Sequence, residues 1–214
     1  MPKVGVQPIR RRQLITATIE AIHAYGYDDT TIARIAAKAG LSSGIISHYF
    51  GGKSELLAAT MRSLLADLQR QVSFRLKQER TPLGRIEAIV AANFDETQCT
   101  PQMVAAWLAF WAQVPHAPEL KRLQRVYSRR LRSNLRAELR RIGLDDPRRD
   151  DVAEILGSLI DGIWVRAALD GSRLDTARAR RRTMGLLRLL LGGQAGELSY
   201  PRQALSQQAL SQQD

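Results

Sequence analysis

Residues 29–57 constrain the fold more than any other stretch, because they have the pattern of two short helices joined by a tight glycine turn. Asp29, Thr30 and Thr31 carry side-chain oxygens that can accept hydrogen bonds from the unpaired amides of an opening helical turn. Gly40 can adopt the left-handed conformation that ends a helix. Between them runs an apolar stripe with helical spacing, formed by Ile32, Ile35, Ala36 and Ala39. The pattern predicts a helix-turn-helix, which places a helix in DNA.

The second helix of this pair is short and carries small and hydrogen-bonding residues on its outer side. Ser42 is predicted to cap it, while Leu41, Ile46 and Phe50 have the spacing of inward-facing residues. The side chains expected on or near the outward face are Ser43, Gly44, Ile45, Ser47, His48 and Tyr49. Such a face fits the major groove and leaves little to clash with base edges. The alternative is an ordinary helical hairpin.

Two kinds of contact with double-stranded DNA are expected. The residues expected to face the bases are Ser43, Gly44, Ile45 and His48, with the Ile45 side chain against a thymine methyl group. The residues expected to hold phosphates are Thr31, Arg34, Tyr49 and Lys53. Arg10 to Arg12 could add backbone or minor-groove contacts, although an unbound basic arm explains them equally well.

Several segments of the hairpin resemble the DNA-binding domain of the tetracycline-repressor family of bacterial regulators. Residues 31–36, 39–42, 44–46 and 49–56 carry this resemblance, which covers about the first quarter of the chain. It implies a three-helix DNA-binding domain over residues 8–68, with the helix-turn-helix at 31–50. Ser47 departs from the family pattern, because a tyrosine that contacts phosphate is usual there. We therefore expect Ser47 to face DNA, but the phosphate contact of the family's tyrosine is not assigned to it.

A narrower resemblance spans most of the chain. Residues 44–50, 109–113 and 159–166 are similar to the choline-responsive repressors of glycine-betaine synthesis genes. The similarity implies a repressor that binds a small cationic effector, choline or a relative such as betaine aldehyde, and thereby leaves its operator. The controlled genes would serve choline uptake and its oxidation to the osmoprotectant glycine betaine. Within the repressor class, the alternative is a multidrug or lipophilic-cation-responsive repressor of an efflux gene.

Composition limits the class of protein. The chain has 32 Lys and Arg against 21 Asp and Glu, a net charge of +11, which favours an anionic partner such as nucleic acid or an acidic membrane surface. Much of the excess lies in residues 121–149 and 178–182, where it could simply solvate a helix face. Cys99 is the only cysteine, which excludes an intrachain disulfide and favours a reducing compartment. Without a membrane-spanning run or a signal-peptide pattern, we expect a cytoplasmic protein that does not bind membranes.

Catalytic and metal-binding patterns are lacking in the sequence. No Ser-His-Asp, Cys-His or phosphate-loop arrangement occurs, so a small helical enzyme is disfavoured. The three histidines, His23, His48 and His116, lack metal-ligand spacing with Cys99 or with a carboxylate pair. We therefore expect no catalytic residue, no metal and no cofactor.

A 3.6-residue period dominates the chain and no alternating strand pattern occurs, which predicts an all-α fold. The first helix is expected from about residue 10 to Gly26, and a long helix from residue 53 to about 80. Further helices are expected at 82–97, 101–114, 117–142, 148–169 and 174–192. We expect the long helix to be the mechanical link between the DNA-reading part and the rest of the chain. An effector can release DNA only by favouring the protein geometry that does not bind DNA.

Residues 69–193 are expected to form a regulatory ligand-binding and dimerisation domain, and residues 194–214 a mobile tail. Two helices near the end are apolar over so wide an arc that a partner subunit should cover them, as in the four-helix bundle of a homodimer. Burial inside the monomer is the alternative. Twofold symmetry would place two reading helices about 34 Å apart, one duplex turn, and so match a palindromic operator.

Aromatic residues make up 6% of the chain, yet six of them gather in the regulatory region: Phe94, Trp107, Phe110, Trp111, Tyr127 and Trp164. A quaternary ammonium cannot donate a conventional hydrogen bond, so proteins recognise it with aromatic faces and a carboxylate. The candidate effector site consists of Phe94, Trp107, Trp111 and Trp164, with Asp161 as the counter-charge. The alternative is a hydrophobic core, which an aromatic stripe serves more often.

Overall fold

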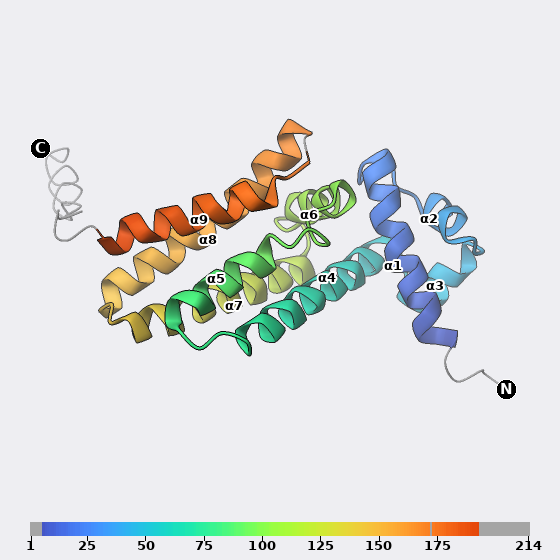
Figure 1. Ribbon diagram of the computed structural model, residues 1–214. Coiled ribbons are helices and arrows are strands. Elements are labelled where there is room, and N and C mark those ends of the chain that lie inside the picture. The colour runs from blue at the N-terminus through green and yellow to red at the C-terminus, as the bar shows by residue number, and fades with distance from the viewer. Residues whose placement is uncertain (1–5, 172, 193–214) are drawn as a thin grey trace, which may run out of the picture.

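The computed structural model describes residues 6–171 and 173–192, which form helices joined by short loops (Figure 1). The all-α class is thereby confirmed for the described residues. In chain order the helices are α1 (Val6–Tyr25), α2 (Ile32–Ala39), α3 (Gly44–Phe50), α4 (Lys53–Leu76), α5 (Pro82–Asn93), α6 (Pro101–Gln113), α7 (Pro118–Ile142), α8 (Asp146–Asp170) and α9 (Thr176–Gly192). The predicted tail at 194–214 and residue 193 lie outside the described residues.

Helices α1, α2 and α3 gather at one end of the molecule and share a small core (Figure 1). Leu14, Ile35 and Ile46, one from each helix, are fully buried there. Leu56 joins them from the first turns of α4. The short α2 and α3 are therefore held by packing against α1 and α4, since helices of this length are marginal alone.

The start and end of α2 follow from local signals. Thr31 is its N-cap, and its side-chain oxygen accepts a hydrogen bond from the Arg34 amide at 3.2 Å. Gly40 ends the helix at φ 64°, and its amide donates to the Ala37 carbonyl. Both features agree with the sequence prediction.

The predicted cap of α3 was wrong by one residue. Ser43, and not Ser42, occupies the N-cap position, and it has a helical backbone with no side-chain cap hydrogen bond. Side-chain capping requires an extended backbone at the cap residue, which this turn does not provide. Ser42 contributes only its carbonyl, which accepts from the Ile45 amide at 3.1 Å.

Two helices end earlier than the periodicity predicts. α4 stops at Leu76 and not near residue 80, and the Leu76 carbonyl accepts a hydrogen bond from Arg85 Nη1 at 2.7 Å. α5 stops at Asn93 and not at 97, and the Asn93 carbonyl accepts from Trp164 Nε1 at 3.2 Å. Side chains distant in sequence thus satisfy carbonyls that a longer helix would have bonded internally. At the other end of the chain, α1 begins at Val6, one turn before the predicted start.

The large core lies among α4 to α9 and extends to α1. Phe94, Phe110 and Leu135 are fully buried within it, and Ile22 of α1 also belongs to it. α6 packs against α1, and α4 runs unbroken from the small core into the large one (Figure 1). The regions expected on either side of residue 68 therefore share one continuous helix. No helix in the described part of the chain is both long and apolar enough to cross a membrane.

Candidate DNA interface and effector cavity

Helix α3 turns its polar side away from the protein. Ser43, Gly44, Ser47 and His48 are exposed, whereas Ile46 and Phe50 are buried in the small core. Ile45 and Tyr49 are half-buried and pack against the edge of that core. The helix lies at the outer end of the molecule (Figure 1). Its exposed face is available to a large partner, and contact with bases remains a prediction.

The two cations predicted to hold phosphates are both bonded to the loop between α1 and α2. Lys53 Nζ donates to the Tyr27 carbonyl at 2.6 Å and to the Asp28 carbonyl at 3.2 Å, and it lies 4.2 Å from the centroid of the Tyr27 ring. The Arg34 guanidinium donates to the Asp29 carbonyl. These cations are therefore positioned by backbone carbonyls before any DNA is present.

Arg34 also has an aromatic partner, and Thr31 remains accessible. The Arg34 guanidinium carbon lies 4.5 Å from the centroid of the Tyr25 ring. Thr31 is exposed and uses its oxygen as an acceptor for the cap, which leaves its hydroxyl hydrogen for a phosphate.

Arg11 is a functional contact that the sequence does not reveal. Arg10 to Arg12 lie within α1 and do not form a separate arm. Arg11 Nη1 donates to the Tyr49 carbonyl at 3.1 Å, and its guanidinium carbon lies 4.5 Å from the centroid of the Phe50 ring. Arg11 thereby fixes the end of α3 on α1, over a separation of 38 residues that local pattern analysis cannot bridge.

Three of the predicted effector residues meet at one narrow cavity. The residues that line it are Leu68, Asn93, Gln98, Trp107, Trp111, Tyr127 and Trp164. Trp107 is central, with its ring centroid 5.5 Å from that of Trp111, 5.5 Å from that of Tyr127 and 6.2 Å from that of Trp164. Aromatic faces from α6, α7 and α8 therefore surround a small space, as recognition of an organic cation requires.

Asp161 and Phe94 do not line this cavity. Asp161 lies behind its wall, where Oδ1 accepts a hydrogen bond from the Tyr127 hydroxyl at 2.9 Å. Phe94 is fully buried in the large core, and its carbonyl accepts from Arg180 Nη2 at 2.6 Å. Tyr127 thus takes the lining position that the prediction gave to Phe94, and Asp161 could act on a ligand through Tyr127.

Burial controls the protonation of this pair. It raises the pKa of Asp161 to about 6, the hydrogen bond from Tyr127 opposes the rise, and the negative charge of Glu154 adds to it. Burial, followed by the charge of Asp161, raises the pKa of Tyr127 well above its usual value. At neutral pH Asp161 is therefore mainly ionised and accepts from a neutral phenol. Its negative charge lies directly behind the aromatic wall.

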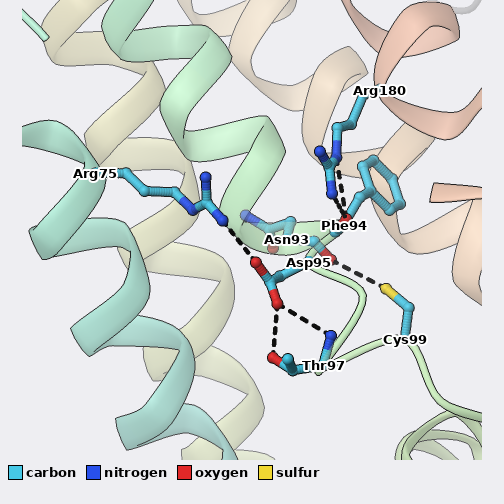
Figure 2. A network of polar contacts seen from close by, with 7 residues as sticks. All are labelled: Arg75, Asn93, Phe94, Asp95, Thr97, Cys99 and Arg180. Carbon is cyan, nitrogen blue, oxygen red and sulfur yellow. Dashed lines mark hydrogen bonds and ion pairs between the residues drawn. The ribbon is translucent and has the colours of Figure 1, made fainter. Parts of the chain in front are cut away.

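The loop of residues 94–100, which joins α5 to α6, contributes Gln98 to the lining of the cavity. Hydrogen bonds and an ion pair fix this loop from several sides (Figure 2). Arg75 Nη2 of α4 donates to Asp95 at 2.6 Å, and the other oxygen of Asp95 accepts from the Thr97 amide and hydroxyl. Burial would raise the pKa of Asp95, but the bonds from Thr97 and Arg75 outweigh it and lower the pKa. The loop is thus tied to α4 on one side and, through Arg180, to α9 on the other.

Cys99 lies at the end of this loop and is unsuited to chemistry. Its thiol is buried and contacts the Asn93 carbonyl at 3.9 Å (Figure 2). Burial raises the pKa of the thiol to about 12, so the reactive thiolate is scarce at neutral pH. Its role is therefore packing.

A second narrow cavity adjoins the aromatic one and shares Leu68, Asn93 and Tyr127 with it. Its other walls come from α4, α5 and α7, and are formed by Leu65, Gln69, Val72, Ile89, Val126, Arg130, Leu131 and Asn134. This second space is mostly aliphatic. Its lining suits an apolar substituent but offers few aromatic faces to a cation.

Two family models match the chain. The model described as "Bacterial regulatory proteins, tetR family" matches residues 14–60, which contain α2 and α3. The model described as "BetI-type transcriptional repressor, C-terminal" matches residues 82–192, from the first residue of α5 to the last of α9.

Curated relatives are similar over almost their whole length. The HTH-type transcriptional regulator BetI of Serratia proteamaculans is 48% identical over 195 residues, which is 90% of this chain and 98% of that protein. The protein of the same name from Escherichia coli K12 is 52% identical over 187 residues, which is 86% of this chain and 94% of that protein.

Solved structures have the same fold at lower identity. A transcriptional regulator from Pseudomonas aeruginosa PAO1 superposes with a TM-score of 0.76 at 25% identity, covering 87% of this chain and 92% of its own. A transcriptional regulator from Saccharomonospora viridis, solved in complex with choline, has a TM-score of 0.67 at 22% identity, covering 83% of this chain and 95% of its own.

Proposed function

The chain belongs to the TetR family of bacterial regulators, with the C-terminal domain of a BetI-type transcriptional repressor, and we propose that choline controls its repression. Like its relatives, it is a DNA-binding transcriptional repressor and not an enzyme. Regulators of this family bind operator DNA as dimers. The proposal adds the identity of the effector, the residues that contact DNA and the helices that form the dimer interface.

The aromatic cavity carries this proposal. Three indole rings and one phenol surround it, with the carboxylate of Asp161 behind the phenol. A quaternary ammonium over such rings gains roughly 0.5–2 kcal/mol per favourable face without a directed hydrogen bond. Gln98 and Asn93 also line the space and can bond the single hydroxyl of choline. The choline complex of the S. viridis protein, which shares this fold, supports the same ligand class.

Operator recognition is assigned to the exposed side of α3. Ser43, Gly44, Ile45 and His48 face the bases, and Ile45 contacts a thymine methyl group. Ser47 lies on the same DNA-facing side. Phosphates are held by Thr31, Arg34, Tyr49 and Lys53. Lys53 and Arg34 donate hydrogen bonds to loop carbonyls. A phosphate must therefore share each cation with these carbonyls or displace them.

The dimer is assigned to α8 and α9, where large apolar side chains are exposed. Leu189 of α9 is 74% exposed and Leu169 of α8 is 73% exposed, and Ile155 of α8 is exposed as well. Pairing these helices across a twofold axis would form a four-helix bundle and remove that surface from water. The symmetric dimer would read a palindromic operator with its two copies of α3.

The regulated genes are those for choline uptake and its oxidation to glycine betaine, and the protein acts in the cytoplasm, where its DNA is. Footprinting on the DNA upstream of its own gene tests the proposal. We expect a protected palindrome that becomes accessible when choline is added. Protection that choline leaves unchanged would contradict effector release, and the absence of any protected site there would contradict control of neighbouring genes.

A multidrug or lipophilic-cation response is the second candidate, and the adjoining aliphatic cavity favours it. Calorimetric titration with choline and with a bulkier lipophilic cation separates the two. The choline proposal expects tight, saturable choline binding and weaker binding of the bulky cation. The reverse order would assign the chain to the efflux regulators.

A further inference from the structure

The positive charge of this protein is concentrated far from its reading helix. Residues 1–68, which contain α1 to α3, have a net charge of +3, whereas residues 69–192 have a net charge of +9. Helix α7 alone carries nine basic and two acidic residues. A repressor that used its charge only around α3 would not need this distribution.

The cations of α7 lie in a narrow band, which we call the basic stripe. It consists of Lys121, Arg122, Arg125, Arg129, Arg132, Arg136 and Arg140. At 3.6 residues per turn these seven positions fall within an arc of about 100°, and at 1.5 Å per residue they span about 28 Å. All are exposed except Arg136, which is half-buried.

Most of the stripe is not neutralised within the protein. Arg132 pairs with Glu154 of α8 at 3.6 Å and Arg136 with Asp150 at 2.9 Å. The other five cations have no carboxylate within ion-pair distance among the described residues: Lys121, Arg122, Arg125, Arg129 and Arg140. Uncompensated like charges on one face repel each other, and this cost is removed when a polyanion binds.

The composition of the stripe favours nucleic acid over a membrane. A helix that lies on a membrane needs an apolar face beside its cations, with aromatic or leucine side chains that enter the lipid. Between Lys121 and Arg140, the only large apolar side chain that is exposed is Val126, at 36% exposure. Arginine side chains along one face of a helix suit the phosphates of nucleic acid, because a guanidinium binds a phosphate through paired hydrogen bonds.

The stripe and α3 lie on different parts of the molecule. α7 runs beside α4, away from the end that holds α3 (Figure 1). Its first turn is fixed to α4 by the ion pair of Glu119 with Arg62, nine residues after Lys53. We propose that the basic stripe of α7 binds a second DNA duplex without sequence preference while α3 holds the operator. This inference rests on operator binding as proposed above.

A capture experiment tests the stripe directly. A biotinylated short duplex containing the footprinted operator is fixed on beads and loaded with the full chain, and unbound protein is washed away. A fluorescent duplex of unrelated sequence is then added at about 50 mM salt and, in a second series, at about 200 mM. We expect capture of the fluorescent duplex at low salt and its loss at high salt.

Charge-removing and charge-keeping variants are compared. Arg122→Gln/Arg125→Gln/Arg129→Gln should lose capture of the second duplex, with the slope of log affinity against log salt reduced by about three. The same three positions changed to Lys keep the charges and should retain capture. Both variants should stay on the operator beads as the parent chain does, which separates this inference from operator binding itself.

The inference would be overturned by equal capture by the glutamine variant and the parent, by no capture by the parent at low salt, or by stripe-dependent binding to phosphatidylglycerol vesicles in place of DNA. Loss of the glutamine variant from the operator beads would also refute it, because the stripe would then belong to operator recognition. Absence of the parent chain from those beads would instead refute the operator assignment.

Discussion

At the scale of single residues, we expect Asp161 to couple effector binding to pH. Choline keeps its charge at every pH, so a pH dependence of its binding reports on the protein. The pKa of Asp161 is about 6, and a bound cation favours the ionised carboxylate. We therefore expect choline affinity to fall as the pH decreases through about 6. Choline binding near pH 6 should also release protons, because it lowers the pKa of Asp161.

Calorimetry between pH 5 and 7.5 checks this, with Asp161→Asn as the control. If choline lowers the pKa by about one unit, reciprocity sets the loss of affinity at low pH to about tenfold. Asp161→Asn should bind choline weakly and with no step near pH 6. A step of equal size in Asp161→Asn would assign the pH dependence to another group.

The aromatic wall gives a second residue-scale prediction. Trp111 is half-buried at the cavity, and its Nε1 donates to Gln124 at 3.2 Å. Trp111→Ala should weaken choline binding by about tenfold, because it removes one cation–π face worth roughly 1–2 kcal/mol. Phe74→Ala, which removes an aromatic ring that is 62% exposed and outside the cavity, should leave the affinity unchanged. Similar losses in both variants would contradict the assignment of this site.

At the DNA interface, phosphate and base contacts should respond differently to mutation. Lys53→Ala should weaken binding to many sequences alike, because it removes a phosphate contact and the bonds to Tyr27 and Asp28. Ile45→Ala should change the preference among sequences by about 1–3 kcal/mol at one base pair. Selection from a random duplex library measures both effects. Uniform losses from both variants would show that the base-reading face lies elsewhere.

Residue-scale prediction from the sequence succeeded where the signal was local. The cap at Thr31 and the left-handed Gly40 depend on neighbours within a few positions. Tyr127 was not selected for the effector site, because its partners Trp107 and Asp161 lie 20 and 34 positions away. Phe94 was selected by composition alone, which cannot separate a core ring from a cavity ring.

At the scale of helices, buried charge joins α5 to α7. Glu138 of α7 is 4% exposed and pairs with Arg85 of α5 at 2.6 Å and with Arg141 at 2.7 Å. Removing one partner of a buried pair leaves a charge that burial penalises. Arg85→Ala should therefore lower the free energy of unfolding by about 3 kcal/mol.

Denaturant unfolding checks this value, with Arg62→Ala as the matched control. Arg62 and Glu119 join α4 to α7 by an ion pair whose side chains are 47% and 52% exposed. Breaking an exposed pair should cost less than about 1 kcal/mol. Equal losses in the two variants would mean that burial of Glu138 does not decide the effect.

Periodicity predicts the order of the helices and the all-α fold class, but it does not always predict where a helix ends. The ends of α4 and α5 depend on Arg85, Trp164 and Arg180, which approach only after the chain has folded. The start of α6 at Pro101, by contrast, was placed correctly, because Thr100 caps it locally and proline favours a first turn.

At the scale of the whole molecule, the dimer determines operator binding. Leu189→Glu places a charge at the most exposed apolar position of α9 and should produce monomers that bind the operator at least tenfold more weakly. Sedimentation velocity and binding to the footprinted duplex measure the two effects. Phe74→Glu, on α4, should remain dimeric. A Leu189→Glu protein that stays dimeric would place the interface on other helices.

The unbroken α4 would turn a small change at the proposed effector cavity into a large one at the DNA. Leu68 borders the aromatic cavity and Lys53 lies beside α3, fifteen residues away on the same helix, which is about 22 Å. A tilt of about 5° pivoting near Leu68 would carry the Lys53 end roughly 2 Å, the amplification of a lever arm. In a symmetric dimer both arms swing, so the mismatch with a rigid duplex doubles. A ligand of a few heavy atoms could thus move both copies of α3 off the operator by filling the aromatic cavity of each subunit.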